Sequence, residues 1–201
     1  MVNHFNNRNS QKKIVVAMDS FKGSLTSLEA GNAVRDGILE NYPDFDVQIF
    51  PVADGGEGTV EALTFGKEHV QARTISVTGP VGTEVQAWYT IYGQAGERTA
   101  VLEMAQAAGL PLVPEEKRNP MHTTTYGVGE MICDAIACGC RKFILGIGGS
   151  ATNDAGIGML QALGFGFLDK NGNQIRFGAK GLEDLESITT DHVLPELKEC
   201  T

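Results

Sequence analysis

The sequence lacks the signals that mark several large classes of protein. No apolar run approaches the roughly 18 residues of a membrane span, and Met1–Lys13 is polar and rich in asparagine, without the apolar core of a signal peptide. The Gly-x4-Gly-Lys-Ser/Thr motif of P-loop enzymes is also absent. We therefore expect a cytoplasmic protein with no membrane partner, and we expect residues 1–12 to form a disordered tail.

Positive charge is scarce as well. The 16 Lys and Arg residues are outnumbered by 25 Asp and Glu residues, which leaves a formal net charge of −9. Because binding to a phosphate backbone needs a basic face, this composition argues against nucleic acid as a partner. An anionic small molecule would also meet a repulsive field, so its binding would need local cations such as Lys22, Arg118 or a metal ion.

Cysteine and histidine are few and are not spaced as metal ligands. Cys133, Cys138 and Cys140 are separated by five and two residues, which matches no zinc motif. The histidines are scattered along the chain, and no Ser-His-Asp order suggests a hydrolase. We expect the cysteines to be reduced thiols.

The composition that remains is typical of a globular α/β protein, with 42% hydrophobic residues and 25 glycines among 201 residues. Apolar strand patterns at Ile14–Met18 and Asp46–Ala53 alternate with helical patterns at 26–42 and 58–67. The first helix opens with a capping box, Thr26–Glu29. Strands that alternate with helices in this way imply a parallel sheet.

After about residue 78 the pattern becomes that of a mixed sheet. Residues Val85–Tyr92 alternate between apolar and polar positions, and Arg98–Met104 is the predicted partner strand. A hairpin is predicted around Asn171-Gly172, and a helix over Thr124–Cys138. We therefore place a boundary between two domains near residue 78.

The most informative stretch is residues 143–156. A strand pattern, Phe143–Ile147, which we expect to be buried, leads into a glycine turn and a helix over 155–163. The free N–H groups and the dipole of a helix N-terminus favour anions. Ordinary capping would need only one polar side chain. Here four polar residues come after two glycines: Ser150, Thr152, Asn153 and Asp154.

Two other strands end in an aspartate followed by a glycine-bearing loop. Asp19 follows the first strand and Asp54 follows the second. If the strands are neighbours in a parallel sheet, both carboxylates lie at the edge where such sheets bind ligands. Close carboxylates repel one another unless a cation lies between them, and Mg²⁺ with a phosphate is the usual occupant. The alternative is that each aspartate is only a helix cap or a turn residue.

Two more segments bear on binding. Arg118 and Thr123–Thr125 place a guanidinium and three hydroxyls ahead of a helix, which suggests a phosphate or carboxylate site. The alternative is that Thr124 or Thr125 simply caps the helix. Met104–Leu110 carries no catalytic group, and we interpret it as a closely packed helix.

Three motifs together closely resemble the type-1 glycerate kinase family. They are VAMDSFKGSL at 16–25, PVADGGEGT at 51–59 and GIGGSATNDAG at 146–156, in the same order and with fitting separations. The resemblance runs from about residue 13 to the end of the sequence. It implies ATP-dependent phosphorylation of D-glycerate with Mg²⁺. It also implies a flavodoxin-like domain and a second α/β domain with a mixed sheet, with the active site in the cleft between them.

The chemistry of the motif residues suits phosphoryl transfer, which asks a protein mainly for positioning and charge neutralisation. Asp19, Lys22 and Asp54 are the candidate catalytic residues, and the two aspartates are also the candidate metal ligands. Which aspartate acts as the base stays open, as does which hydroxyl of glycerate is phosphorylated. The candidate substrate- or phosphate-binding residues are Ser20, Ser24, Gly55, Gly56, Gly148, Gly149, Ser150, Thr152, Asn153 and Asp154.

Members of this family are nearly twice this length, and the end of their chain completes the flavodoxin-like domain. We therefore expect a fragment with impaired activity, in which residues 13–78 form an incomplete flavodoxin-like domain and residues 79–201 a second domain. An incomplete sheet leaves an open apolar edge, so we expect the chain either to self-associate through that region or to be partly disordered there.

Two other classes of function remain as alternatives. One is a non-catalytic binding module. The other is a nucleotide-binding oxidoreductase, because residues 146–151 fit Gly-x-Gly-x-x-Gly/Ala after a strand. The acidic ribose-binding residue of that pattern would be Asp169, which falls in the predicted hairpin and not at a strand end, so the context fails.

Overall fold

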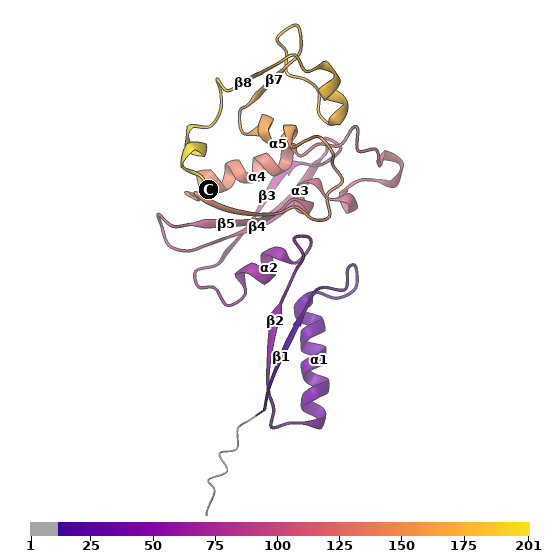
Figure 1. The fold of residues 1–201 in the computed structure, drawn as a ribbon, viewed down its shortest axis with the longest axis vertical. Coiled ribbons are helices and arrows are strands. Elements are labelled where there is room, and N and C mark those ends of the chain that lie inside the picture. The colour runs from indigo at the N-terminus through magenta and orange to yellow at the C-terminus, as the bar shows by residue number, and fades with distance from the viewer. Residues whose placement is uncertain (1–11) are drawn as a thin grey trace, which may run out of the picture. The chain divides into compact units, whose positions relative to one another are not determined.

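The computed structural model describes residues 12–201, so the predicted tail lies outside the described residues except for Lys12. The chain forms two compact units, Met1–Ala53 and Asp54–Thr201, which are described separately (Figure 1). The compact units meet at residues 53 and 54, whereas the predicted domain boundary lies near residue 78. The difference arises because the helix and strand that follow Asp54 pair and pack within the second unit.

The first unit contains β1 (Lys13–Met18), α1 (Ser27–Asn41) and β2 (Asp46–Pro51). The predicted parallel pairing is confirmed, with Lys13 opposite Asp46 and Met18 opposite Pro51. The predicted capping box is also present: Thr26 Oγ1 accepts from the Glu29 amide, and the Glu29 carboxylate accepts from the Thr26 amide at 2.8 Å. Because the two strands are parallel, the chain leaves β1 and β2 at the same end of the pair.

The second unit is built on a mixed four-stranded sheet in the order β3-β4-β5-β6, as predicted for this part of the chain. Its strands are β3 (Gln71–Thr78), β4 (Glu84–Tyr92), β5 (Thr99–Glu103) and β6 (Lys142–Gly146). The first three are antiparallel, and β5 and β6 are parallel. Figure 1 shows α4 (Tyr126–Ala137) over one face of this sheet and α2 (Thr59–Thr64) over the other.

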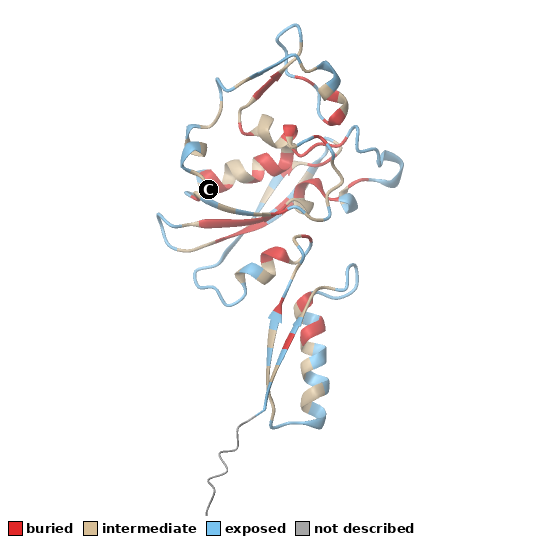
Figure 2. Cartoon of the chain, viewed as in Figure 1, coloured by how far each residue is buried: buried red, intermediate tan, exposed pale blue. Residues whose placement is uncertain are grey.

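The core of the second unit lies between the sheet and α4, together with the short helix α3 (Ala105–Ala108) (Figure 2). Tyr89 and Leu102 on the strands and Val128 and Met131 on α4 are fully buried. The alternation predicted for Val85–Tyr92 is confirmed on its buried face. β6 differs from the prediction of a buried strand, since it lies at an edge of the sheet. Its Ile144 is 38% exposed, and Ile147, just beyond it, is 68% exposed.

The remaining elements follow β6. Helix α5 (Ile157–Ala162) packs on α4, and β7 (Gly166–Leu168) pairs with β8 (Ser187–Thr189). The predicted turn at Asn171-Gly172 forms, but the ladder partner of β7 is β8, and Gln174 makes only a single bridge. Short 3₁₀ helices occur at Leu110–Leu112, Glu115–Lys117, Ala179–Asp184 and Pro195–Glu199. Within residues 12–201, no helix has the length and apolar character needed to cross a bilayer.

Candidate functional site

Two of the glycine-rich motifs pack directly on each other. The backbone amide of Gly148 donates to the carbonyl of Gly55 at 2.7 Å. A Cβ atom at Gly148 would lie 2.7 Å from the backbone of Gly56, and one at Gly146 would lie 2.7 Å from the Gly55 carbonyl oxygen. At Gly146 and Gly148 the missing side chains let the two loops touch.

The loop after β2 is held in shape by its own polar groups. Asp54 Oδ1 accepts from the amide of Gly56 at 3.1 Å, and the Thr59 hydroxyl donates to the carbonyl of Gly56 at 2.7 Å. Gly55 and Gly58 have φ values of +97° and +90°, a region that residues with a side chain rarely adopt. These bonds and backbone angles hold the loop in one conformation beside the turn that follows β6.

A residue that the sequence analysis missed ties this loop to the sheet. Glu103, the last residue of β5, is 2% exposed, and its carboxylate accepts from the amide of Val60 at 2.8 Å. Burial raises the pKa of Glu103, although the amides of Val60 and Gly58 and the Gln106 side chain act in the opposite direction. The signal available in the sequence was a charged residue directly after the apolar run Ala100–Leu102.

The turn after β6 is closed by hydroxyl groups and framed by the Met104–Leu110 segment. The hydroxyl oxygens of Ser150 and Thr152 lie 2.7 Å apart, and the Thr152 amide donates to Ser150 Oγ at 3.1 Å. The amide of Leu110 donates to the Gly149 carbonyl at 3.0 Å, and the amide of Ala151 donates to the Ala108 carbonyl at 2.8 Å. The predicted helix at Met104–Leu110 forms only over Ala105–Ala108, where Ala107 and Ala108 are buried. Leu110 is exposed, and the segment fixes the turn.

Asp154 has a different place from the one predicted. It is 2% exposed, and its carboxylate accepts from the Thr125 amide and hydroxyl, both at 2.9 Å. It also accepts from the amides of Gly156 at 3.1 Å and Gly158 at 3.2 Å. The prediction that Asp154 binds substrate or phosphate is not supported by this geometry, because its oxygens are occupied by protein donors. It joins the starts of α4 and α5.

The threonines ahead of α4 serve the same structural purpose. Thr123, Thr124 and Thr125 are all buried. Thr123 Oγ1 donates to the Ala151 carbonyl at 2.7 Å, and Thr124 Oγ1 accepts from the Tyr126 amide at 3.2 Å. Thr125 is the N-cap residue of α4, but its side chain makes no capping hydrogen bond. The threonine hydroxyls bond to the protein itself, and thus support the starts of the helices and the Ser150 turn. Asn153, by contrast, is exposed.

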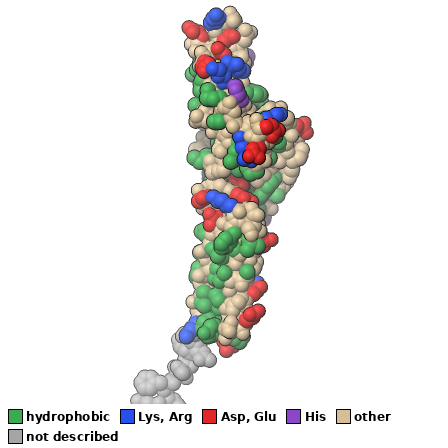
Figure 3. Space-filling view, turned by 90° about the vertical axis from the view of Figure 1, so that its right-hand side faces the viewer, with side chains coloured by type: hydrophobic (Ala, Val, Ile, Leu, Met, Phe, Trp, Pro, Cys, Tyr) green, Lys and Arg blue, Asp and Glu red, His purple; other side chains and the backbone are tan. Residues whose placement is uncertain are grey.

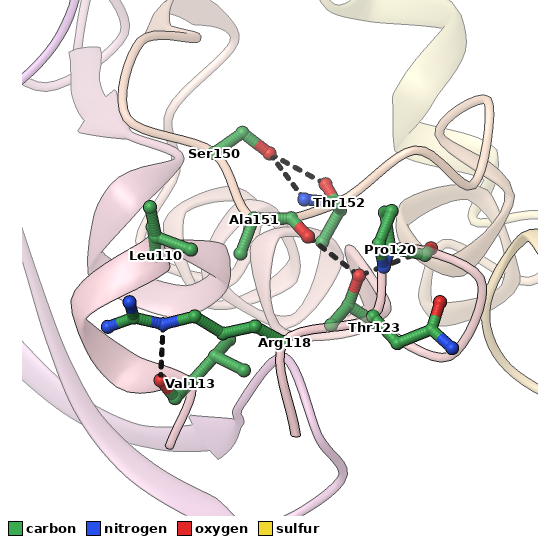
Figure 4. A pocket seen from close by; sticks show the side chains of 9 residues that line it. Leu110, Val113, Arg118, Pro120, Thr123, Ser150, Ala151 and Thr152 are labelled. Carbon is green, nitrogen blue, oxygen red and sulfur yellow. Dashed lines mark hydrogen bonds between the residues drawn. The ribbon is translucent and has the colours of Figure 1, made fainter. Parts of the chain in front are cut away.

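Arg118 and the residues of the Ser150 turn line the same pocket. The cavity has a volume of about 330 Å³, and its polar lining residues are Arg118, Asn119, Thr123, Ser150 and Thr152. Figure 4 shows the Ser150 and Thr152 hydroxyls turned toward each other and the Nε of Arg118 bonded to the Val113 carbonyl. Arg118 and the Ser150 turn are about 30 residues apart in the sequence, and the fold brings them to one cavity.

The loop after β1 belongs to the first unit. The amide of Ser20 donates to Asp19 Oδ1 at 2.7 Å, and a bridge between Phe21 and Leu25 closes the loop that carries the exposed Lys22 and Ser24. The hydroxyl of Ser20 is buried and has no hydrogen-bond partner among the described residues. Such an orphaned donor is suited to a ligand atom.

The structure also bears on metals and on the oxidoreductase alternative. Within residues 12–201, no group of three or more His, Cys, Asp or Glu side chains is placed to hold a metal ion. Asp169, the residue that would bind a ribose, uses its carboxylate to accept from the amides of Asn171 and Asn173 at 2.8 and 2.9 Å within its own turn. The geometry thus gives no support to a dinucleotide site there.

These features define a mixed α/β protein in which glycine-rich loops follow the ends of strands and pack against each other. A sequence model of the glycerate kinase family matches residues 14–201. The chain belongs to the glycerate kinase family.

Individual relatives are similar over nearly the whole chain. A glycerate 2-kinase of Escherichia coli K12 is 48% identical over 188 residues, which are 94% of this chain and 49% of the relative. A glycerate kinase of Bacillus subtilis 168 is 50% identical over 178 residues, 88% of this chain and 45% of the relative. The crystal structure of a Salmonella typhimurium LT2 protein designated glycerate kinase 2 superposes with a TM-score of 0.81 at 46% identity, covering 94% of this chain and 50% of that one. The chain spans about half the length of the curated relatives it matches.

Proposed function

We propose that this chain takes part in the ATP-dependent phosphorylation of D-glycerate. The observation that carries the proposal is the packing of two family motifs on each other through the Gly148–Gly55 hydrogen bond, beside a cavity that holds Arg118, Ser150 and Thr152. In the reaction, a hydroxyl oxygen of glycerate forms a bond to the γ-phosphorus of ATP. The bond from that phosphorus to the bridging oxygen of ADP breaks, and the hydroxyl proton passes to a base.

The residues of the first two motifs are suited to the charges in this reaction. One of Asp19 and Asp54 would accept the hydroxyl proton, and Lys22 would neutralise charge on the transferring phosphoryl group or on the glycerate carboxylate. Ser20, whose buried hydroxyl has no partner among the described residues, and Ser24 would contact the substrate.

These residues could hold Mg²⁺ only together with the phosphates of the nucleotide, as many nucleotide enzymes do. Mg²⁺ is commonly bound by one or two carboxylates together with substrate phosphates, and it does not need a cage made only of protein ligands. The described residues provide no such cage, so Asp54 or Asp19 would supply the protein ligand. When bound, the ion supplies charge neutralisation on the phosphates.

The glycine loops would contribute their backbone amides. The amides of Gly56 and Gly148 already donate to Asp54 and to the Gly55 carbonyl, and these bonds fix the loops. The amides of Gly55 and Gly149 would then face the ligand, and fixed amides stabilise developing negative charge without reorganisation. The face drawn in Figure 3 carries basic and acidic side chains intermixed. Because the chain has a net charge of −9, an anionic substrate would need local hydrogen-bond donors such as the backbone amides of the glycine loops.

The test combines binding with phosphoryl transfer. Binding of D-glycerate and of ATP to the 201-residue chain is measured by calorimetry, and transfer is followed with radiolabelled ATP and Mg²⁺. We expect both ligands to bind. We expect Asp54→Asn to reduce the glycerate-dependent transfer by about 100-fold or more without lowering the melting temperature.

The matched control is Asp44→Asn, an exposed aspartate in the turn between α1 and β2, which is expected to behave like the parent. A chain that binds neither ligand would contradict the proposal. Binding of both ligands without any transfer would favour the non-catalytic binding module.

A further inference from the structure

The cavity beside the Ser150 turn has polar lining groups that are suited to an anion. Arg118 is the only charged residue among those that line it, and no carboxylate does so. The guanidinium is oriented by the bond from its Nε to the Val113 carbonyl at 3.4 Å, and its two terminal amino groups make no hydrogen bond to another described residue. Guanidinium groups with free terminal N–H donors bind phosphate and carboxylate oxygens well.

Part of the cavity wall is apolar. Leu110, Val113 and Pro120 are among the lining residues, interspersed with the polar ones, and Leu110 is 46% exposed in this position. D-glycerate carries an oxygen on each of its three carbons, so it has no apolar surface to place against such a wall. The planar base and the ribose of a nucleotide do have such surface.

The size of the cavity points the same way. A volume of about 330 Å³ falls in the range of roughly 300–1,000 Å³ that takes drug-sized ligands. A three-carbon acid would fill a small part of it and leave the rest to water.

The cavity is also rigidly built. The Leu110 amide donates to the Gly149 carbonyl at 3.0 Å, and the Thr123 hydroxyl donates to the Ala151 carbonyl at 2.7 Å, so two of the lining segments are hydrogen-bonded to the Ser150 turn. A ligand that enters would order little of the protein, which favours affinity.

We propose that this pocket holds the nucleotide and not the glycerate. The nucleotide phosphates contact Arg118 and the hydroxyls of Ser150 and Thr152, and its base or ribose lies on Leu110, Val113 and Pro120. The assignment rests on the proposed kinase function, and it divides the two substrates of that reaction between separate places in the chain.

The experiment uses a fluorescent N-methylanthraniloyl derivative of ADP as the nucleotide probe and D-glycerate as the second ligand, on the 201-residue chain. We expect Arg118→Met to weaken binding of the probe by about tenfold or more, because a charge-assisted contact is lost. Leu110→Ser is expected to weaken it severalfold. Both variants should bind D-glycerate as the parent does, and saturating D-glycerate should not displace the probe.

Two variants serve as controls. Lys117→Met removes the same charge from the residue next to Arg118, which does not line the cavity, and Ile188→Ser replaces a 59% exposed apolar residue on β8. Both should bind the probe like the parent.

The outcomes separate this assignment from the kinase proposal. If Arg118→Met binds the probe as tightly as the parent, or if glycerate displaces the probe, the pocket assignment is wrong and the kinase proposal stands. If the parent binds glycerate but not the probe, the assignment is also wrong. If the parent binds neither ligand, both proposals are wrong.

Discussion

The carboxylate of Glu103 accepts a 2.8 Å hydrogen bond from the backbone amide of Val60, in the first turn of α2. Helix α2 has Gly58 at its N-cap and no side-chain cap of its own, so an acceptor from β5 takes that place. Because β5 pairs with β6, with Glu103 opposite Gly146, one buried carboxylate links the loop after β2 to the strand that leads into the Ser150 turn.

Replacing Glu103 should therefore loosen the loop that carries Asp54. Glu103→Ala leaves the buried amide of Val60 without its acceptor, and we expect a loss of about 1–3 kcal/mol in the free energy of unfolding. Glu103→Gln keeps an acceptor oxygen and should lose less. Urea unfolding at pH 7 measures both, with the exposed Glu97→Gln as the control.

The same residue predicts a pH dependence. Burial raises the pKa of Glu103 in the folded state above its unfolded value of about 4.3, so the folded state binds the proton more tightly. The contribution to stability is therefore present below about pH 4.3 and is lost as the pH rises through the raised pKa. Comparing the unfolding free energies of the parent and Glu103→Gln from pH 4 to pH 8 should show the parent falling relative to the variant. Parallel curves would contradict this.

The contact between the glycine loops predicts an ordering of glycine variants. In Gly148→Ala the new Cβ would lie 2.7 Å from the backbone of Gly56, and we expect a loss of about 1–3 kcal/mol because neither backbone can yield freely. In Gly149→Ala the cost, about 1–2 kcal/mol, comes from the φ of +72°. A valine at Gly149 would add β-branched strain, so alanine is the cleaner change.

The control for this series is Gly37→Ala in α1, where a Cβ would meet nothing within 4 Å. Alanine there should stabilise the chain by about 0.5–1 kcal/mol. A Gly148→Ala variant as stable as the parent would show that the two loops do not pack as described.

Asp154 is predicted to matter for stability and not for ligand contact. In Asp154→Asn one carboxylate oxygen becomes an amino group that faces amide donors, and a charged acceptor is lost at the starts of α4 and α5. We expect a loss of about 1.5–3 kcal/mol, measured by thermal and urea unfolding. The exposed Asp191→Asn should have little effect. A stable variant with weakened phosphate binding would restore Asp154 as a binding residue.

The buried Tyr89 hydroxyl donates to Asp134, which also receives two 2.8 Å bonds from Arg73. Burial acts to raise the pKa of Asp134, but the bonds from Arg73 and Tyr89 outweigh it, so the pKa is lowered. Tyr89→Phe should lose about 1.5–3 kcal/mol at pH 7. That loss should shrink as the pH falls below about 3.9, where the carboxylate becomes protonated. Tyr42→Phe, at a 56% exposed position, is the control, and a loss that does not depend on pH would contradict the coupling to Asp134.

The features that the sequence by itself determined are those with a local cause. The capping box at Thr26–Glu29 depends on residues three apart, the alternation of Val85–Tyr92 on the two-residue period of a strand, and the parallel pairing of β1 with β2 on the helix that separates them. The three motifs likewise identified the family, because each is a short run of residues whose order and separation can be read directly.

What only the tertiary structure decided are contacts between residues far apart in the chain. No local pattern shows that Glu103 meets Val60, that Asp154 is enclosed between α4 and α5, or that the partner of β7 is β8 and not the strand after its turn. The same polar residue can cap a helix, anchor a loop or bind a ligand. Its role depends on the hydrogen-bond donors around it and on its burial, and the rest of the fold sets both. For this reason Arg118 and Ser150 line one pocket, whereas Asp154 is buried and bonded to protein donors.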